Sequence, residues 1–212
     1  MMPTHGSRIE IVPYDACWPG AFEAEAVRLR AALETMVLRI DHHGSTAIPG
    51  LAAKPIIDIQ VSVSALQPLS AYGSRLEAIG YVHVPHPDDS FCPFFHRPLR
   101  WPHTHHLHVV ERGGREERRT LAFRDYLRDH SGVAGEYADL KRTVAARIGS
   151  ADPASQDRYA AAKTDFIERI VALAFAAGYP RENLSLSPLC ALVPSHSRTV
   201  ALPPRCSSDI VS

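Results

Sequence analysis

The sequence HHGSTAIPGLAAKPIIDIQ, residues 42–60, decides the fold. Gly44 and Ser45 come shortly after the strand expected at 36–40, and they predict a tight turn that ends it. The segment Ile56–Val63 then alternates β-branched with polar residues, a pattern typical of a buried strand. Because alternate side chains of a strand point to opposite faces, Asp58 is expected on the face opposite its isoleucine neighbours.

The turn at Gly44 and Ser45 has the composition of a phosphate site. Glycine has no Cβ, so its backbone can approach a ligand closely. Backbone amides of the turn, the amino end of a following helix and the Ser45 hydroxyl can together bind a phosphate. The alternative is a plain turn without a ligand, since Gly-Ser pairs are common in turns.

Asp58 is an acidic residue inside an apolar strand. Burying a carboxylate is costly unless the carboxylate has a partner of opposite charge. A divalent metal ion or a neighbouring cationic side chain would supply that partner. The alternative to a metal site is therefore a structural ion pair, for which Lys54 is the nearest candidate in sequence.

Two histidines, His106 and His108, lie two positions apart in a predicted strand and therefore project to the same face. Such a pair can bind a metal, contact phosphate or transfer protons near neutral pH. Arg97, farther upstream, can supply another phosphate contact. The alternative is one buried histidine with satisfied hydrogen bonds beside one surface histidine.

The composition is that of a globular protein. The chain has 212 residues, of which 45% are hydrophobic and 22% charged, so it can form one domain with a substantial core. Lysine plus arginine equal aspartate plus glutamate at 23 each. Without a net basic charge, we do not expect nucleic acid as a partner.

The lack of a targeting signal and the pattern of cysteines predict a cytoplasmic protein. The N-terminus lacks a signal-peptide pattern, and no apolar run is long enough to cross a membrane. We therefore expect a cytoplasmic protein with no membrane partner. Four widely spaced cysteines without a CxxC pair predict reduced thiols rather than a zinc ribbon or a disulfide framework.

Periodicity along the rest of the chain predicts a mixture of helices and strands. Strands are expected at 8–12, 36–40, 56–63, 81–84, 91–95 and 106–111. Helices are expected at 19–34, 66–79, 116–130, 135–148 and 156–177. Beyond Asn183 the chain is rich in proline and serine without a clear period, which predicts a loosely attached or poorly ordered tail.

Several blocks of this sequence resemble the GrpB family, also called UPF0157. They read IVPYDACWP at 11–19, DHHGSTAIPGLAAKPIIDI at 41–59, THHLHVV at 104–110 and FRDYL at 123–127. A helical pattern containing Tyr137, Lys141, Tyr159 and Lys163 follows them. The resemblance covers about residues 8–178, with the blocks long and in order.

The resemblance implies a fold, because the GrpB family is assigned to the nucleotidyltransferase-fold superfamily. The expected architecture is α+β (α/β): a small mixed sheet flanked by helices, with C-terminal helices forming one wall of a cleft. It also implies the domain organisation. We expect a GrpB-like domain over residues 1–180 and a proline- and serine-rich tail over residues 181–212.

The resemblance also implies site residues. Catalytic and metal-binding roles are expected for Asp58, His106 and His108. Phosphate or nucleotide contacts are expected from family positions, together with Thr46 and the arginine noted above, which gives the set His42, Gly44, Ser45, Thr46, Lys54, Arg97, Lys141, Tyr159 and Lys163.

One departure from the superfamily concerns the metal. Active nucleotidyltransferases usually carry Asp-x-Asp on the strand, whereas this chain reads Asp58-Ile59-Gln60. Glutamine is a poor ligand for Mg²⁺. A set of one carboxylate with His106 and His108 would suit Mn²⁺, Zn²⁺ or Fe²⁺ better than Mg²⁺. The alternative is that no catalytic metal binds.

Together these features predict a nucleotidyltransferase-like enzyme. It would transfer a nucleotidyl or phosphoryl group from a nucleoside triphosphate to a small-molecule acceptor, assisted by a divalent metal, Mg²⁺ or Mn²⁺ with Zn²⁺ as the alternative. A non-catalytic nucleotide-binding module and a metal-dependent hydrolase using the histidines are the rival hypotheses. The family's frequent label of dephospho-CoA kinase is not expected to apply, because the chain has no GxxxxGK[ST] loop.

Overall fold

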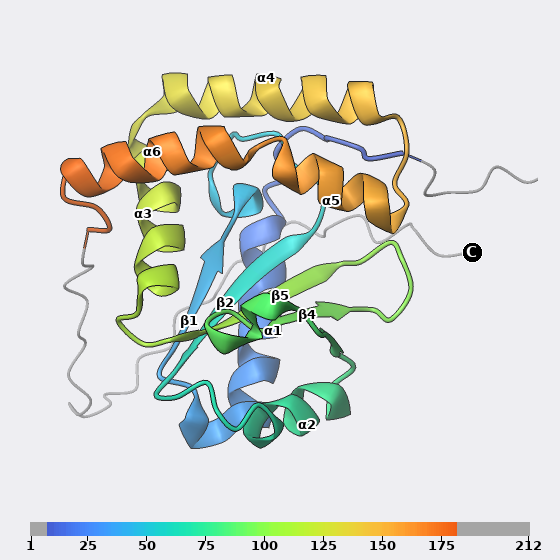
Figure 1. Ribbon diagram of the computed structural model, residues 1–212, viewed down its shortest axis with the longest axis vertical. Coiled ribbons are helices and arrows are strands. Elements are labelled where there is room, and N and C mark those ends of the chain that lie inside the picture. The colour runs from blue at the N-terminus through green and yellow to red at the C-terminus, as the bar shows by residue number, and fades with distance from the viewer. Residues whose placement is uncertain (1–7, 182–212) are drawn as a thin grey trace, which may run out of the picture. The chain divides into compact units, whose positions relative to one another are not determined.

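A five-stranded mixed sheet forms the centre of the protein (Figure 1). The computed structural model describes residues 8–181, so the predicted tail from residue 182 onward lies outside the described residues. The strands are β1 (Arg39–His43), β2 (Ile57–Val63), β3 (Val82–Val84), β4 (Phe94–Arg97) and β5 (His105–Glu111), in the order β1-β2-β5-β4-β3. Only the central pair, β2 with β5, is parallel.

Six helices surround the sheet in the part of the chain that the structure describes. They are α1 (Trp18–Leu33), α2 (Ser70–Ala78), α3 (Arg115–Asp129), α4 (Ser131–Ile148), α5 (Pro153–Ala161) and α6 (Thr164–Ala176). Three short 3₁₀ turns, η1 (Glu34–Met36), η2 (Ser45–Ala47) and η3 (Pro87–Ser90), complete the order. Figure 1 shows α4, α5 and α6 as a helical layer on one side of the sheet, with α1 and α2 on the other. The expected α+β class is confirmed.

The apolar face of the sheet forms the main core. Alternation along the strands gives this face its β-branched and aromatic side chains, and α1 and α2 cover them. Ile59, Val61, Leu107 and Phe95 are all fully buried there. Burial of each such side chain stabilises the fold by about 1.5–3 kcal/mol.

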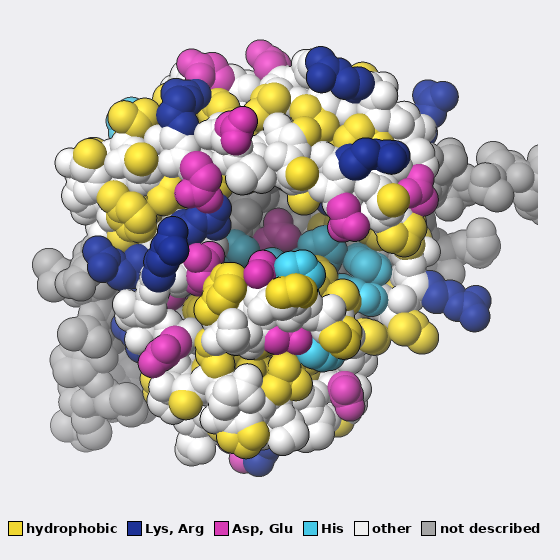
Figure 2. All heavy atoms as spheres, viewed as in Figure 1, with side chains coloured by type: hydrophobic (Ala, Val, Ile, Leu, Met, Phe, Trp, Pro, Cys, Tyr) yellow, Lys and Arg dark blue, Asp and Glu magenta, His cyan; other side chains and the backbone are white. Residues whose placement is uncertain are grey.

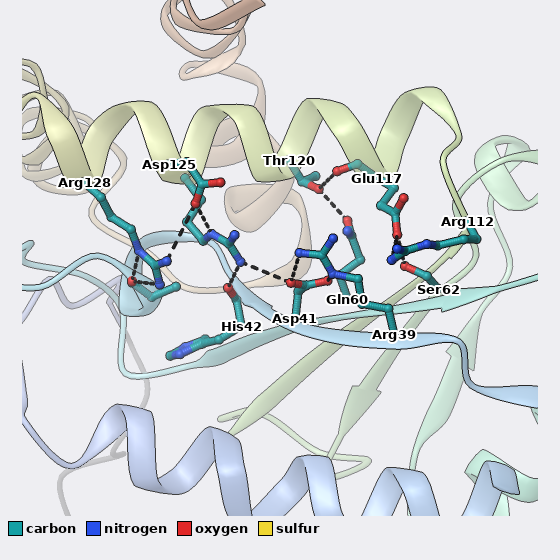
Figure 3. A network of polar contacts seen from close by, with 12 residues as sticks. Arg39, Asp41, His42, Gln60, Ser62, Arg112, Glu117, Thr120, Asp125 and Arg128 are labelled. Carbon is teal, nitrogen blue, oxygen red and sulfur yellow. Dashed lines mark hydrogen bonds and ion pairs between the residues drawn. The ribbon is translucent and has the colours of Figure 1, made fainter. Parts of the chain in front are cut away.

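The opposite face of β1 and β2 is polar and lies under α3 (Figure 3). Buried polar groups need hydrogen-bond partners, and α3 supplies several of them. Three pairs join the helix to the sheet: Thr120 with Gln60, Glu117 with Ser62, and Arg124 with Asp41. Arg124 also donates a hydrogen bond to the carbonyl oxygen of His42, at 3.0 Å. This network fixes α3 across the two strands.

Most predicted elements are confirmed, with several corrected bounds. The expected strand at 36–40 begins three residues later, at Arg39, and includes both histidines before Gly44. The expected strand at 91–95 is shifted to Phe94–Arg97. The expected strand at 8–12 is wrong, since its only pairing is a single bridge between Val12 and Ala53. These errors arise because pairing partners, rather than local propensity, decide where a strand begins.

The expected single helix at 156–177 is also wrong, because the chain turns between α5 and α6. The helix α5 begins earlier, where Asp152 caps its first turn by accepting a hydrogen bond from Ser155 N, at 2.9 Å. The turn at Ala162 and Lys163 brings the Lys163 ammonium over the Tyr159 ring, 4.2 Å from its centroid. A helical period alone did not reveal this break.

Two further expectations concern the cysteines and the membrane. Cys92 is a free thiol, but Cys17 is disulfide-bonded, so the expectation of reduced thiols is wrong at Cys17. Among the described residues, none of the helices has the length and apolar character needed to cross a membrane.

Replacing Glu117 with glutamine is expected to lower the free energy of unfolding by about 1–3 kcal/mol. The buried carboxylate accepts hydrogen bonds from Ser62 Oγ and Gly113 N, and an amide group would turn a donor toward one of these donors. Chemical denaturation measures the change. The control is Glu116→Gln, which removes the same charge from a more exposed neighbour and should cost no more than about 0.5 kcal/mol. Equal losses in the two variants would contradict the role of the buried network.

Candidate active site

The turn after β1 rests directly on Asp58. The strand β1 ends at His43, which pairs with Asp58 across the antiparallel ladder. Gly44 then adopts φ +67° and ψ −168°, a conformation that side-chain-bearing residues rarely adopt. A Cβ on Gly44 would lie 2.8 Å from the Cβ and Cγ atoms of Asp58 and still closer to its carboxylate. Only glycine therefore allows this backbone to pass over the carboxylate.

The Asp58 carboxylate is ionised and partly accessible. Its side chain is 27% exposed, and Oδ1 lies 3.4 Å from Nδ1 of His106, its partner on β5. Burial by itself would raise the pKa of Asp58, but the hydrogen bond from His106 and the nearby histidines outweigh burial and hold that pKa well below its usual range. Figure 2 shows histidine and acidic side chains along a hollow between the helical layer and the sheet.

Three lysines from separate segments lie at this site. Lys141, on α4, donates hydrogen bonds to Ser45 Oγ, at 2.9 Å, and to a backbone carbonyl at residue 52. Lys54 donates to Gln156 Oε1 at 3.0 Å. Lys54 and Lys163 lie over the Tyr159 ring, 5.1 and 4.2 Å from its centroid. Among the described residues, none of these three ammonium groups forms an ion pair with a carboxylate.

The charged forms of the three lysines are disfavoured, as their lowered pKa values show. Burial and the charge of Lys163 lower the pKa of Lys141 to about 7, while burial and the charge of Lys54 lower the pKa of Lys163 to about 8. Burial also lowers the pKa of Lys54. The negative charge of Asp58 raises the pKa of each of the three lysines, so all three lie around the same carboxylate. A bound anion would relieve their mutual repulsion.

Tyr137 joins the site although the predicted site did not include it. Its ring lies under the Lys141 ammonium, 4.7 Å from the nitrogen, and burial raises the pKa of its hydroxyl. The sequence signal is spacing, since Tyr137 stands one helical turn before Lys141. The structure thus brings together eight of the predicted residues: Gly44, Ser45, Lys54, Asp58, His106, Lys141, Tyr159 and Lys163.

Other predicted residues lie elsewhere. His42 points to the apolar face, where its ring stacks on Phe22 at 4.8 Å and its Nε2 bonds Thr46 Oγ1 at 2.9 Å. Thr46 donates in turn to the carbonyl at residue 56. Arg97 binds the buried Glu25 at 2.8 Å on the core side of the sheet. These contacts hold the turn and the core together, and they leave the three side chains outside the lysine cluster.

The predicted metal ligands are not gathered into one shell. His108 pairs with Gln60 in the β2–β5 register, so it lies two residues, about 6–7 Å, along the strand from the Asp58–His106 pair. Its Nδ1 instead lies 3.6 Å from Cys92 Sγ. Within residues 8–181, no group of three histidine, cysteine or acidic side chains is placed to hold a metal ion. The side chains therefore do not fit a three-ligand metal site.

A model of the family described as "GrpB protein" matches residues 8–172. The chain belongs to the GrpB family. The crystal structure of the conserved protein GrpB from Enterococcus faecalis is 34% identical and superposes with a TM-score of 0.69, covering 79% of this chain and 98% of that one. The expected family is therefore confirmed by both sequence and structure.

Bacterial relatives in the GrpB family differ in length. The UPF0157 protein YqkA of Bacillus subtilis is 35% identical over 161 residues, which are 76% of this chain and 46% of that protein. The UPF0157 protein BH1888 of Halalkalibacterium halodurans is 37% identical over 169 residues, which are 79% of this chain and 83% of that protein. A dephospho-CoA kinase of Mycobacterium leprae is 29% identical over 184 residues, 74% of this chain and 44% of that protein. The chain thus spans less than half of YqkA and of the kinase.

Alanine at Gly44 is expected to lower the free energy of unfolding more than alanine at Gly50. Both glycines have positive φ, +67° and +77°, so alanine is strained by about 1–3 kcal/mol at either position. Only at Gly44 does the added Cβ collide with Asp58, since nothing lies within 4 Å at Gly50. Chemical denaturation of both variants measures the difference. Equal losses would mean that the carboxylate moves aside without cost.

Proposed function

We propose that the protein binds a nucleoside triphosphate at the Gly44–Asp58 site and transfers a nucleotidyl or phosphoryl group to a small-molecule acceptor. The observation that carries this proposal is the cluster of Lys54, Lys141 and Lys163, three buried or half-buried ammonium groups without carboxylate partners. Such a cluster suits a polyanion, because several negative charges relieve the repulsion among the lysines at once.

In this proposal the turn and the lysines bind different phosphates of the nucleotide. The open backbone at Gly44 and the Ser45 hydroxyl lie at one end of the cluster, where Lys141 already holds the hydroxyl. At the other end of the cluster, Lys163 and Lys54 lie over the Tyr159 ring. Fixed positive charges of this kind stabilise the charge that spreads over the phosphate oxygens during transfer.

Asp58 and His106 supply the proton chemistry in this proposal. They form a carboxylate–imidazole pair at the edge of the lysine cluster, an arrangement that orients an imidazole and stabilises its protonated form. A cytoplasmic location, where nucleoside triphosphates are abundant, belongs to the same proposal.

A non-catalytic nucleotide-binding module is the second candidate, and Gln60 favours it. Gln60 occupies the position where the superfamily's second acid is expected. Its side chain is fully buried and accepts a hydrogen bond from Thr120. The helix α3 therefore closes this position to any ligand. Binding of nucleotide without turnover would support this module.

A divalent metal stays a prediction. Since the described side chains do not form a three-ligand site, no step of the proposal depends on one. Nucleotide titrations with and without Mg²⁺, Mn²⁺ or Zn²⁺ test this prediction. The same absence leaves the rival hypothesis of a metal-dependent hydrolase without a structural observation in its favour.

The experiment that tests the proposed function is a calorimetric titration with ATP, followed by chromatography of the products. With water as the acceptor, conversion of ATP to AMP and pyrophosphate, or to ADP and phosphate, supports a transferase. Binding with ATP intact favours the module. Absence of binding would contradict both. Dephospho-CoA kinase activity is not part of the proposal, because the chain lacks a GxxxxGK[ST] loop.

Replacing Lys163 with methionine is expected to weaken ATP binding by about 10- to 100-fold, since a charge-assisted hydrogen bond contributes about 1.5–3 kcal/mol. The matched control is Arg142→Met, which removes the same charge from an exposed side chain paired with Asp139. Calorimetry measures both dissociation constants. An equal effect of the two changes would indicate general charge attraction rather than a lysine site.

ATP binding at about pH 8 is expected to take up protons. The pKa values of Lys141 and Lys163, about 7 and 8, leave part of each population neutral in the free protein, and bound phosphate favours the charged form. Affinity should therefore fall as the pH rises through this range, although the phosphates themselves are already fully ionised. Calorimetry in buffers of different ionisation enthalpy measures the uptake. Proton release, or no exchange, would contradict the expected linkage.

A further inference from the structure

All the lysines of the chain meet at one site. Of the 23 lysine and arginine residues in the sequence, only Lys54, Lys141 and Lys163 are lysines. Everywhere else the basic residue is arginine, whose guanidinium does not lose its charge in proteins. A lysine differs because burial can neutralise its amine, which can then accept a proton. The distribution therefore indicates a site that uses an amine, rather than a positive charge alone.

Lys141 lies against the hydroxyl of Ser45. Its Nζ is 2.9 Å from Ser45 Oγ, and it also donates a hydrogen bond to the carbonyl oxygen of Ala52. Lys141 is only 2% exposed, whereas Ser45 is partly exposed. A ligand can therefore reach the hydroxyl, while the amine contacts it from inside the protein.

Both contacts of Lys141 are compatible with a neutral amine. The carbonyl oxygen needs one N–H donor, and the lone pair of a neutral amine can accept the proton of the Ser45 hydroxyl across the same 2.9 Å. Neither contact is a carboxylate, which would hold the amine in its charged form. Burial and the charge of Lys163 lower the pKa of Lys141 to about 7, so much of the population is neutral at pH 7 in the free protein.

The turn that carries Ser45 presents its hydroxyl at a sharp change of chain direction. The strand β1 ends at His43, and the 3₁₀ turn η2 begins at Ser45. Gly44, between them, takes the strained conformation with φ +67°. In many hydrolases the nucleophilic serine stands on a similar strained turn from a strand to a helix, which exposes its oxygen. The local geometry at Ser45 therefore suits a nucleophile.

We propose that Ser45 is a covalent nucleophile of the transfer reaction and that Lys141 is the base that activates it. This inference rests on the proposed function, from which it takes the nucleoside triphosphate. Ser45 Oγ attacks a phosphorus of the nucleotide, and its proton passes to Lys141 Nζ. A new O–P bond forms and the bond from that phosphorus to its bridging oxygen breaks. Pyrophosphate or the nucleoside diphosphate leaves with the electron pair.

A second step transfers the group from Ser45 to the acceptor. An acceptor oxygen attacks the same phosphorus, the bond to Ser45 Oγ breaks, and Lys141 returns the proton to Oγ. The proton of the acceptor is released to water. The first product therefore leaves before the acceptor reacts, and the chain carries a nucleotidyl or phosphoryl group in between.

The charged groups around Lys141 set the pH dependence of the first step. Asp58 on β2 raises the pKa of Lys141, while Lys163, between α5 and α6, and Arg142 on α4 lower it. Tyr137 beneath the amine is uncharged, because burial raises its pKa. Bound phosphates raise the pKa of Lys141 as Asp58 does, so the neutral amine is the minor form in the complex. The rate of transfer from bound ATP should therefore rise with pH, although the affinity falls.

The adduct on Ser45 can be sought in the wild-type chain. The protein is incubated with ATP labelled in the α- or the γ-phosphate, denatured with detergent, digested and mapped by mass spectrometry. A label on Ser45 is expected, formed at least as fast as ATP turns over and lost again after a chase with unlabelled ATP. Turnover with the label on a lysine or on another hydroxyl, or without any label, would overturn the proposal.

Two variants separate the nucleophile from its base. Ser45→Ala is expected to lower turnover of ATP with water at least about 100-fold, while affinity changes less than about 10-fold. The matched control is Ser74→Ala, at an exposed hydroxyl that bonds the carbonyl oxygen of Ser70 on α2, and turnover should be unchanged. Lys141→Arg keeps the positive charge but cannot lose it, so ATP should bind without forming the adduct. Adduct formation at the wild-type rate in Lys141→Arg would overturn the role of the base.

The outcomes also separate this inference from the proposed function. Chemical denaturation shows whether the buried arginine is tolerated, and the wild-type adduct and Ser45→Ala decide on the nucleophile in either case. Wild-type turnover with an unaffected Ser45→Ala variant overturns the nucleophile and leaves direct transfer to the acceptor. Bound ATP without turnover or label overturns the transferase, and the nucleophile with it. Equal losses of turnover and of ATP binding in Ser45→Ala would make the hydroxyl a binding group, which overturns its role as nucleophile.

Discussion

The close approach of the Gly44 backbone to the Asp58 carboxylate is the contact on which the site depends. Because β1 and β2 pair antiparallel with His43 opposite Asp58, the chain must leave β1 directly over the acid. Any Cβ at Gly44 would occupy the space of the carboxylate. The turn that follows then presents Ser45 to Lys141 on α4. A single steric requirement thus links the sheet, the turn and the helical layer.

The helix α3 covers one part of the polar face of the sheet and leaves the part with Asp58 open. Over β1 and most of β2, Thr120, Glu117 and Arg124 of α3 bind buried polar side chains of the strands (Figure 3). At the start of β2, beyond the reach of these contacts, Asp58 stays partly exposed. Polar residues of one strand therefore have two roles, because the helix covers only part of the strand.

The lysine cluster opposes stability in the free protein, and the proposed function assigns it to the binding of a polyanion. Burial lowers the pKa values of its members, which means that their charged forms are disfavoured in the free protein. Shifted pKa values of this kind are expected at sites where a protein binds a ligand. Aromatic rings under Lys141 and Lys163 offset part of the cost, since a cation over a ring face is stabilised.

The sequence by itself determined the family, the mixed α and β class, the strand that carries Asp58 and most of the residues around it. Periodicity and the Gly-Ser turn are local signals, so they survive without knowledge of partners. Only the tertiary structure decided which candidates meet. Register placed His106 beside Asp58 and His108 beside Gln60, α3 closed the position of Gln60, and the break before α6 brought Lys163 to the cleft. These outcomes depend on pairing and packing between distant segments, which a local pattern does not contain.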